Sequence, residues 1–239
     1  YQRVVLDKEG FEGGHEFNKF GVTVFVLRYR LPGEGWSNRG IASLQDAQRG
    51  MRLIRANASA YSIDPSRLGV LGFSAGGHLA AWLATRHMQH VYEPVDAADT
   101  QDAKPSFAGL VYGVYDVFPP FAHQNLPDLL LGPGASPAAM EVVSPDRLIT
   151  SATPPTFLAQ AADDPTVNPQ NMLAMYSALK AGKVPAEMHM FEQGGHGFGI
   201  RLAAGHPCSV WPYLFLRWGA SHGMFKNAAA GVALPVQYQ

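Results

Sequence analysis

Cysteine is almost absent from this sequence, because Cys208 is the only one among 239 residues. An intramolecular disulfide is therefore excluded, and a structural metal site would have to be built from other residue types. Charge is scarce as well: charged residues make up 15% of the chain, and the formal net charge is -1. This balance gives no net attraction to nucleic acid or to an anionic membrane. We expect a small neutral substrate rather than either of those partners.

Long apolar runs are missing too. No run reaches the roughly 18 residues that cross a bilayer, and the chain does not open with the basic, apolar and small-residue regions of a signal peptide. The sequence begins at Tyr1 rather than Met, so we expect that an N-terminal stretch was removed or left out. The compartment depends on that stretch: periplasmic or secreted if it carried a signal, and cytoplasmic otherwise. Nothing in the sequence indicates an oligomeric state.

Apolar material, in contrast, is abundant. Hydrophobic residues make up 47% of the chain, which is enough for a globular core. A chain of this length commonly forms one domain, so we predict a single domain over residues 1–239. Residues 114–155 contain eight prolines. We expect that segment to be an excursion of loops and short helices over the sheet, forming one wall of a cleft, rather than a second domain.

Strand and helix signals alternate along the chain. Apolar runs predict strands over residues 21–29, 68–72, 107–111, 156–161 and 187–191. The first run hardly alternates, which is typical of a strand covered on both faces. Apolar residues at three- and four-residue steps predict a helix over 41–58, and Asn168, Pro169 and Gly182 mark the ends of another. This order predicts an α/β fold, with a mainly parallel sheet flanked by helices.

A Gly-x-Ser-x-Gly motif surrounds Ser74, directly after an apolar strand and directly before an alanine-rich helix. That context is the one in which the motif forms a nucleophile elbow, and it disfavours an ordinary glycine-rich turn with a helix-capping serine. Crowding in such a sharp turn explains the glycines at 72 and 76 and pushes the serine hydroxyl into the open. At the helix start, the free backbone N–H of Ala75 is predicted to be one oxyanion donor.

A serine hydroxyl is a weak nucleophile, so the motif requires a base and an acid in the chain order Ser, Asp, His. Residues 157–167 are a strand running into an acidic turn, which places a carboxylate at the carboxyl edge of the sheet. Asp163 and Asp164 compete for the role. We favour Asp164, because it begins an Asp-Pro-Thr-Val turn that Asp163 can cap. His196 lies between glycines after the last strand and is the predicted base.

Other titratable residues have simpler explanations. Asp116 follows an earlier strand and is an alternative acid, although capping a turn suits it better. Surface or packing roles are expected for the remaining histidines, which are His15, His78, His87, His90, His123, His189, His206 and His222. No metal-ligand spacing and no phosphate-binding glycine loop is present. We therefore expect a chemistry that needs no cofactor.

These three segments, together with residues 6–10, 27–32, 144–145 and 153–157, resemble bacterial α/β-hydrolase esterases that are grouped with acetylxylan esterases. The likeness covers nearly the whole chain. It implies the α/β-hydrolase fold, and it matches Ser74, Asp164 and His196 to the catalytic triad. The implied activity is hydrolysis of short acyl esters, with acetyl groups on plant polysaccharides such as xylan as substrates.

The chain differs from these esterases at its N-terminus. They carry a glycine-rich oxyanion loop, often Pro-Gly-Gly-Gly-Tyr, before the segment that begins this chain, and Tyr1 corresponds to that tyrosine. By this comparison the second oxyanion donor and the early strands are missing, including one between the strands at 21–29 and 68–72. Gly13-Gly14-His15 falls where the resemblance places a helix, so we predict an irregular helix there. We expect either a fragment or a rearranged sheet.

Three functional hypotheses follow from these patterns. The first is a serine esterase, and the lack of a long apolar lid between residues 114 and 155 favours soluble short-chain esters. Trp36 and Trp211 are candidate platforms for a sugar ring, although each tryptophan suits the core better. The second hypothesis is a serine peptidase of the oligopeptidase type, which generally needs an added domain. The third is a binding protein with the hydrolase fold and no catalysis.

Overall fold

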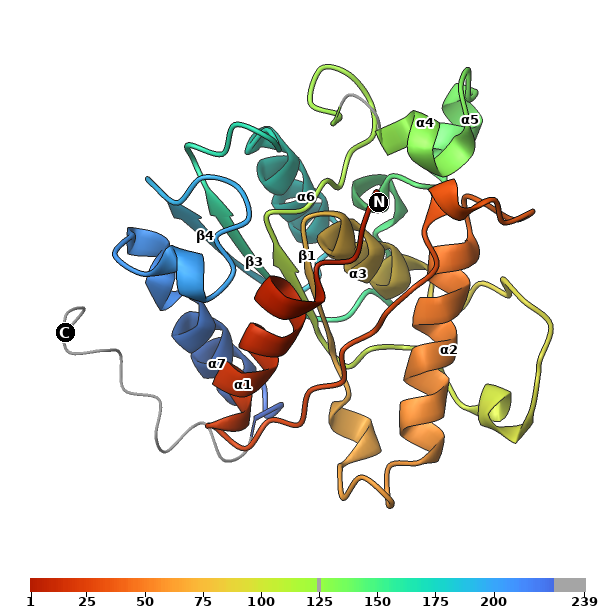
Figure 1. Ribbon diagram of the computed structural model, residues 1–239, viewed down its shortest axis with the longest axis horizontal. Helices are drawn as coiled ribbons and strands as arrows, with labels where there is room; N and C mark the ends of the chain where they lie inside the picture. The colour runs from red at the N-terminus through yellow and green to blue at the C-terminus, as the bar shows by residue number, and fades with distance from the viewer. Residues whose placement is uncertain (124–125, 226–239) are drawn as a thin grey trace.

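The computed structural model describes residues 1–123 and 126–225. Residues 226–239 of the predicted domain and residues 124–125 of the predicted excursion lie outside these ranges. The strands are β1 (Val70–Phe73), β2 (Ala108–Val111), β3 (Thr156–Ala161) and β4 (Ala186–Phe191). The helices are the π-helix η1 (Leu6–Phe11) and α1 (Glu12–Asn18), α2 (Ala42–Ala56), α3 (Ala75–Arg86), α4 (Leu126–Leu131), α5 (Pro137–Glu141), α6 (Gln170–Ala181) and α7 (Trp211–Ser221). Figure 1 shows their arrangement. Short 3₁₀ turns join them.

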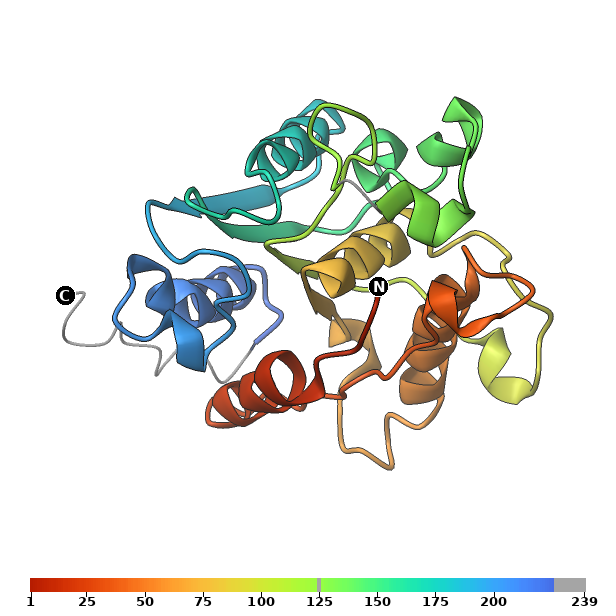
Figure 2. The same ribbon diagram turned by 45° about the horizontal axis from the view of Figure 1, so that its top comes forward.

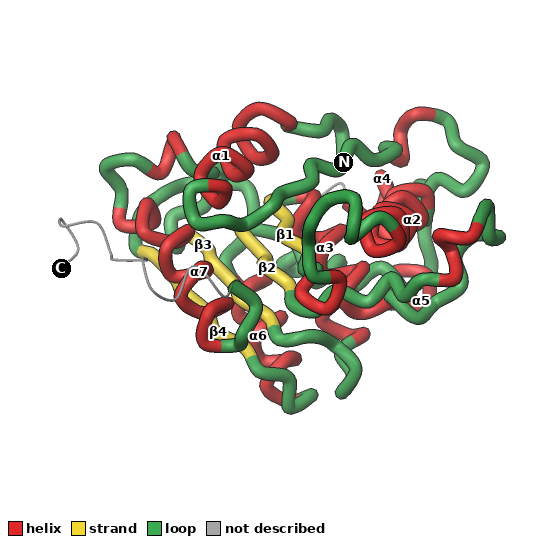
Figure 3. The backbone as a smooth tube through the Cα atoms, turned by 90° about the horizontal axis from the view of Figure 1, so that it is seen from below, coloured by secondary structure: helices red, strands yellow, loops and turns green. Residues whose placement is uncertain are grey.

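The four strands form one parallel sheet in the order β1-β2-β3-β4, and they lie side by side in Figure 3. Each crossover between consecutive parallel strands brings the chain back to the amino edge, so all four carboxyl ends meet at one edge. Three of the connections that leave this edge run into α3, the 114–155 segment and α6. Loops that leave one edge can bring distant residues together.

Helices cover both faces of the sheet. Ala108, Leu110 and Leu158 face α3 and α6 in one buried cluster, whereas Phe157 and Ala159 face α1 and α7 in another. Successive residues of a strand point to opposite faces, which explains this division. Figure 2 shows α6 on one side of the strands and α1 and α7 on the other. The predicted parallel sheet flanked by helices is confirmed.

Most of the predicted elements are confirmed. The last four predicted strands correspond to β1 through β4, and the helix predicted over 41–58 is α2. At the start of α6, Asn168 Oδ1 accepts the N–H of Gln170, and Gly182 caps the far end. Gly13-Gly14-His15 lies in the α-helix α1, so the helix predicted there is confirmed, whereas the irregularity lies just before it, in the π-helical η1. No helix within residues 1–123 and 126–225 is long and apolar enough to span a bilayer.

The strand predicted over residues 21–29 is wrong. Residues 22–30 form no regular structure, and Val24, Phe25 and Leu27 are 37 to 39% exposed instead of covered. A strand needs a neighbour that pairs with its N–H and C=O groups. The edge strand β1 pairs with β2, and a cavity of about 1010 Å³ is lined by both β1 and this run. The run has the composition of a buried strand, but no described strand lies beside it.

Candidate active site

Ser74 occupies a sharp turn between the end of β1 at Phe73 and the start of α3 at Ala75. Its backbone has φ 51° and ψ −118°, a left-handed conformation that is rare outside glycine and typical of strained functional residues. Close packing maintains the turn, because a Cβ added at Gly72 would lie 2.0 Å from the carbonyl oxygen of Gly76. The crowding predicted at Gly76 is wrong, since a Cβ there would meet nothing within 4 Å.

These two glycines make a matched pair for a stability test. Gly72→Ala is expected to lower the free energy of unfolding by about 3 kcal/mol, because the new methyl group must displace backbone atoms. Gly76→Ala has open space and a helical position, so we expect no loss and a gain of up to about 1 kcal/mol. Chemical denaturation of both variants checks this pair. Equal destabilisation of the two would contradict the packing described for the elbow.

The structure brings the three predicted triad residues together. Ser74 Oγ lies 2.9 Å from His196 Nε2, and His196 Nδ1 lies 2.8 Å from Asp164 Oδ2. They come from the β1–α3 turn, the loop after β4 and the loop after β3, all at the carboxyl edge of the sheet. Because an ionised carboxylate only accepts, Nδ1 carries the imidazole proton and Nε2 is left to accept from the serine hydroxyl. This is the tautomer that a general base requires.

Asp164 is held rigidly and stays ionised. Its side chain has no exposed surface, and its Oδ1 accepts the backbone N–H groups of Thr166 and Val167 at 2.8 and 2.9 Å. Burial opposes ionisation, but the hydrogen bonds from His196, Val167 and Thr166 outweigh it and hold the pKa of Asp164 below its usual range. The carboxylate is therefore charged near neutral pH and can stabilise an imidazolium.

The two alternative acids lie elsewhere. Asp163 Oδ1 accepts the backbone N–H of Gly195 at 2.8 Å, so this side chain fastens the loop that carries His196 instead of contacting its ring. Asp116 accepts the backbone N–H of Phe118 and lies 3.7 Å from an Arg147 nitrogen. Asp116 therefore caps a turn, as the sequence favoured.

Ala75 is placed as an oxyanion donor would be. It is the first residue of α3, where a backbone N–H has no acceptor within its own helix. Ser74, Ala75 and His196 all line the cavity of about 1010 Å³ described above. The positive end of the helix dipole adds to the attraction of this N–H for developing negative charge.

Comparison with known proteins identifies the family of this chain. The family model described as BD-FAE matches residues 6–179, which is more than half of the chain. The chain belongs to the BD-FAE family. An acetylxylan esterase from Xylanibacter ruminicola is 30% identical to this BD-FAE member over 206 residues, and endo-1,4-beta-xylanase B from Butyrivibrio fibrisolvens is 30% identical over 200 residues. These matches cover 84% and 80% of this chain, but the chain spans only 39% and 30% of the lengths of those relatives.

Solved structures agree with this membership. An acetyl ester-xyloside bifunctional hydrolase from Caldicellulosiruptor lactoaceticus superposes with a TM-score of 0.83 at 34% identity, covering 93% of this chain and 79% of that chain. The carboxylesterase Cest-2923 from Lactobacillus plantarum superposes with a TM-score of 0.70 at 26% identity, covering 91% and 81%. The predicted α/β-hydrolase fold and the resemblance to acetylxylan esterase-like hydrolases are confirmed.

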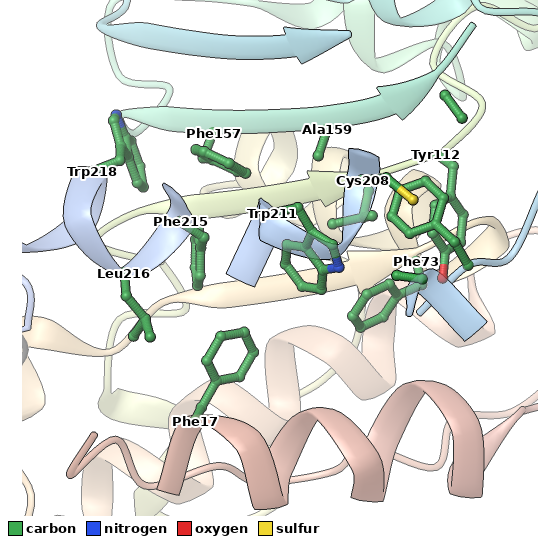
Figure 4. Packing of buried hydrophobic residues seen from close by; sticks show 14 of the residues in the cluster. Phe17, Phe73, Tyr112, Phe157, Ala159, Cys208, Trp211, Phe215, Leu216 and Trp218 are labelled. Atoms are coloured by element: carbon green, nitrogen blue, oxygen red, sulfur yellow. The ribbon is translucent and has the colours of Figure 1, made fainter. Parts of the chain in front are cut away.

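Neither tryptophan predicted as a sugar platform in this BD-FAE protein lines the cavity beside Ser74. The prediction for Trp211 is wrong: it is 0% exposed and packs edge-on against Phe17 and Phe73 in the core, as Figure 4 shows. Its indole N–H donates to the carbonyl oxygen of Gly199. Trp36 is 41% exposed, but its indole N–H donates to Glu34 in its own loop.

Two residues that the sequence analysis did not single out contact the triad. Gln160 Nε2 donates to Asp164 Oδ2 at 2.9 Å, so that oxygen receives a hydrogen bond from each side. Gln160 is a polar residue inside the apolar run 156–161, and this departure from the pattern could have identified it as a candidate. The ring of Tyr112 packs edge-on against the imidazole of His196, with centroids 5.2 Å apart. Nothing local in the sequence marked Tyr112.

His78 shows the packing role that was expected of it. It is fully buried in α3, its Nε2 lies 2.8 Å from the carbonyl oxygen of Val143, and its Nδ1 lies 2.7 Å from the Tyr1 hydroxyl. A carbonyl only accepts, so Nε2 carries the proton and the tyrosine donates to Nδ1. Burial is the main cause that lowers the pKa of His78 from 6.5 to about 4.

This shift predicts a loss of stability in mild acid. Between pH 6.5 and about 4 the unfolded chain binds a proton at His78 that the folded chain does not. The free energy of unfolding therefore falls as the pH falls through this window, by on the order of 3 kcal/mol. Titration of the His78 ring by NMR is expected to show the neutral, Nε2-protonated form down to pH ~5. A midpoint near pH ~6.5 would contradict the buried network.

Proposed function

We propose that this protein is a serine esterase that hydrolyses short acyl esters, with acetyl groups on plant polysaccharides such as xylan as its substrate class. The observation that carries the proposal is the unbroken hydrogen-bonded line from Ser74 through His196 to Asp164, at 2.9 and 2.8 Å. Relatives described as an acetylxylan esterase and as an acetyl ester-xyloside hydrolase support the substrate class.

In the proposed reaction, His196 Nε2 takes the hydroxyl proton of Ser74 while Oγ attacks the ester carbonyl carbon. The carbonyl oxygen becomes an oxyanion, and the N–H of Ala75 stabilises it. His196 then gives its proton to the departing alcohol oxygen, which leaves an acyl group on Ser74. A water molecule, deprotonated by the same imidazole, releases the carboxylic acid and restores the serine. Asp164 stabilises the imidazolium in both halves and keeps its own charge.

Release of acetate from acetylated xylan and of p-nitrophenol from p-nitrophenyl acetate tests this function. We expect both substrates to be hydrolysed, and p-nitrophenyl acetate faster than esters of long acyl chains. An aminoacyl-p-nitroanilide, which releases p-nitroaniline on hydrolysis, serves as the amide substrate for comparison. Hydrolysis of the amide in preference to the acetyl ester would favour the peptidase, and no turnover of any substrate by the folded protein would favour a binding protein.

A further inference from the structure

The loop that carries His196 has little conformational restraint of its own. Four of its glycines have positive φ: Gly194 at 158°, Gly195 at 61°, Gly197 at 74° and Gly199 at 51°. Glycine loses more backbone entropy on ordering than any other residue, so this loop needs contacts from outside to hold one conformation. The imidazole nevertheless has to stay within hydrogen-bond distance of Ser74, because small displacements of a catalytic group cost large factors in rate.

Contacts from three elements hold the two ends of the loop. At one end, Asp163 accepts the N–H of Gly195. At the other end, the Tyr112 hydroxyl accepts the N–H of Gly199 at 3.1 Å, and the Trp211 indole donates to the Gly199 carbonyl at 2.7 Å. Of these three side chains, Tyr112 is the one that contacts both the end of the loop, through its hydroxyl, and the His196 ring, through its own ring.

Tyr112 is itself firmly fixed. It follows β2 directly, it is 0% exposed, and its backbone N–H donates to the carbonyl oxygen of Ala159. Figure 4 shows it at the end of its strand, close to Phe73 and Cys208. Its φ of 39° lies in the left-handed region, where a non-glycine residue is rare and persists only when its surroundings impose it. Such strain at a residue that packs on the catalytic base points to a functional role.

The phenolic proton of Tyr112 reaches Glu9. Burial raises the pKa of Tyr112 well above its usual range, so the hydroxyl keeps its proton. Since Gly199 donates to this hydroxyl, the proton is free to be donated to Glu9 Oε1, which lies 3.2 Å away. Glu9 lies on η1 beside Lys8, whose ammonium nitrogen is 3.6 Å from the carboxylate. The backbone of Lys8 also packs against the loop, because a Cβ added at Gly199 would lie 3.3 Å from the Lys8 carbonyl oxygen.

We propose that Tyr112 and Glu9 are positioning residues for the catalytic base, forming a line from η1 through the phenol to the backbone of the His196 loop. The proposal rests on the proposed esterase function for its kinetic readout. Neither residue touches the reacting atoms. Their role is to keep the His196 ring aligned with both Ser74 and Asp164 during the two proton transfers.

Removing the Tyr112 hydroxyl tests this line. Tyr112→Phe keeps the ring contact with His196 but leaves the Gly199 N–H and the Glu9 carboxylate without their shared partner. We expect kcat for p-nitrophenyl acetate to fall about 30-fold with KM changed by less than about threefold, because alignment affects proton transfer more than substrate binding. Glu9→Ala is expected to lower kcat about tenfold. Glu9→Gln keeps an acceptor oxygen, so its kcat is expected to lie within about threefold of that of the unmodified protein.

Tyr115→Phe is the matched control. Tyr115 is also 0% exposed, and its hydroxyl likewise accepts a backbone N–H, that of Gly113 at 3.1 Å, but it packs with α3 and α6 on the opposite face of the sheet. We expect kcat of this variant to stay within about twofold of the unmodified protein, even if both variants lose similar stability. Equal effects of Tyr112→Phe and Tyr115→Phe on kcat would overturn the proposal.

A spectroscopic readout separates failure of the positioning from failure of the esterase. The His196 Nδ1–H that donates to Asp164 should give a low-field proton resonance. We expect it to broaden or vanish in Tyr112→Phe and to persist in Tyr115→Phe, whether or not any ester is hydrolysed. A resonance that is unchanged in Tyr112→Phe would overturn the positioning role. Absence of ester turnover in the unmodified protein, with the resonance lost only in Tyr112→Phe, would refute the esterase and leave the positioning supported.

Discussion

Replacing Ser74 with alanine is expected to lower kcat for p-nitrophenyl acetate by about a millionfold, to the slow background that the remaining donors support. The substitution removes the oxygen proposed to attack, which lies 2.9 Å from the imidazole nitrogen that accepts its proton. The hydrogen bond between His196 and Asp164 is expected to remain, because it does not involve the serine. The measurement is the initial rate of p-nitrophenol release at saturating substrate.

Ser106→Ala is a suitable control for that experiment. Ser106 precedes β2 at the amino edge of the sheet, where its hydroxyl donates to the carbonyl oxygen of Ser66. The chemical change is the same, but it occurs at the opposite edge from the nucleophile, so the rate should stay within about twofold. A Ser74→Ala variant that is folded and turns over as fast as this control would remove the proposed mechanism.

Asp164→Asn is expected to lower kcat by about 10,000-fold while the fold is kept. An asparagine has no charge to stabilise an imidazolium, and its NH2 group can donate to the ring and hold His196 in the wrong tautomer. The two backbone N–H groups that Oδ1 now accepts can still bond to the amide oxygen. Steady-state kinetics of the variant, together with its melting temperature, check this expectation.

The neighbouring aspartate offers a matched substitution. Asp163→Asn keeps an oxygen that can accept the N–H of Gly195, so we expect kcat to fall by no more than about fivefold. The sequence left both aspartates open as the acid, and the structure places only Asp164 against the imidazole. If Asp163→Asn were the more damaging of the two, the assignment of the acid would have to be reversed.

Local signals explain why the candidate site could be predicted. Ser74 follows an apolar strand in a glycine-flanked turn, Asp164 begins a turn after another strand, and His196 lies in a glycine-rich loop after the last. Each signal lies within about a dozen residues, and parallel strands carry all three to the same edge. The positions of β1 to β4 and the approximate ends of α2 and α6 follow from equally local patterns.

The sequence-based predictions that are wrong or incomplete all concern contacts that local sequence patterns do not encode. Residues 21–29 have the composition of a buried strand, but pairing depends on a neighbour that composition does not supply. Trp211 is amphipathic, so only the tertiary structure decides that its ring is core and its N–H holds Gly199. Tyr112 and Glu9 are 103 residues apart in the chain, and no local sequence pattern around either residue predicts that they are in contact.

Labelling with a fluorophosphonate, followed by mass spectrometry of the peptides, tests the central claim most directly. A serine activated by an imidazole base attacks phosphorus, displaces fluoride and becomes covalently modified, whereas an ordinary surface serine does not. We expect about one phosphonyl group per folded chain, on Ser74, and none after Ser74→Ala or after unfolding. A folded protein that stays unlabelled at Ser74, or that is labelled elsewhere, would contradict the account.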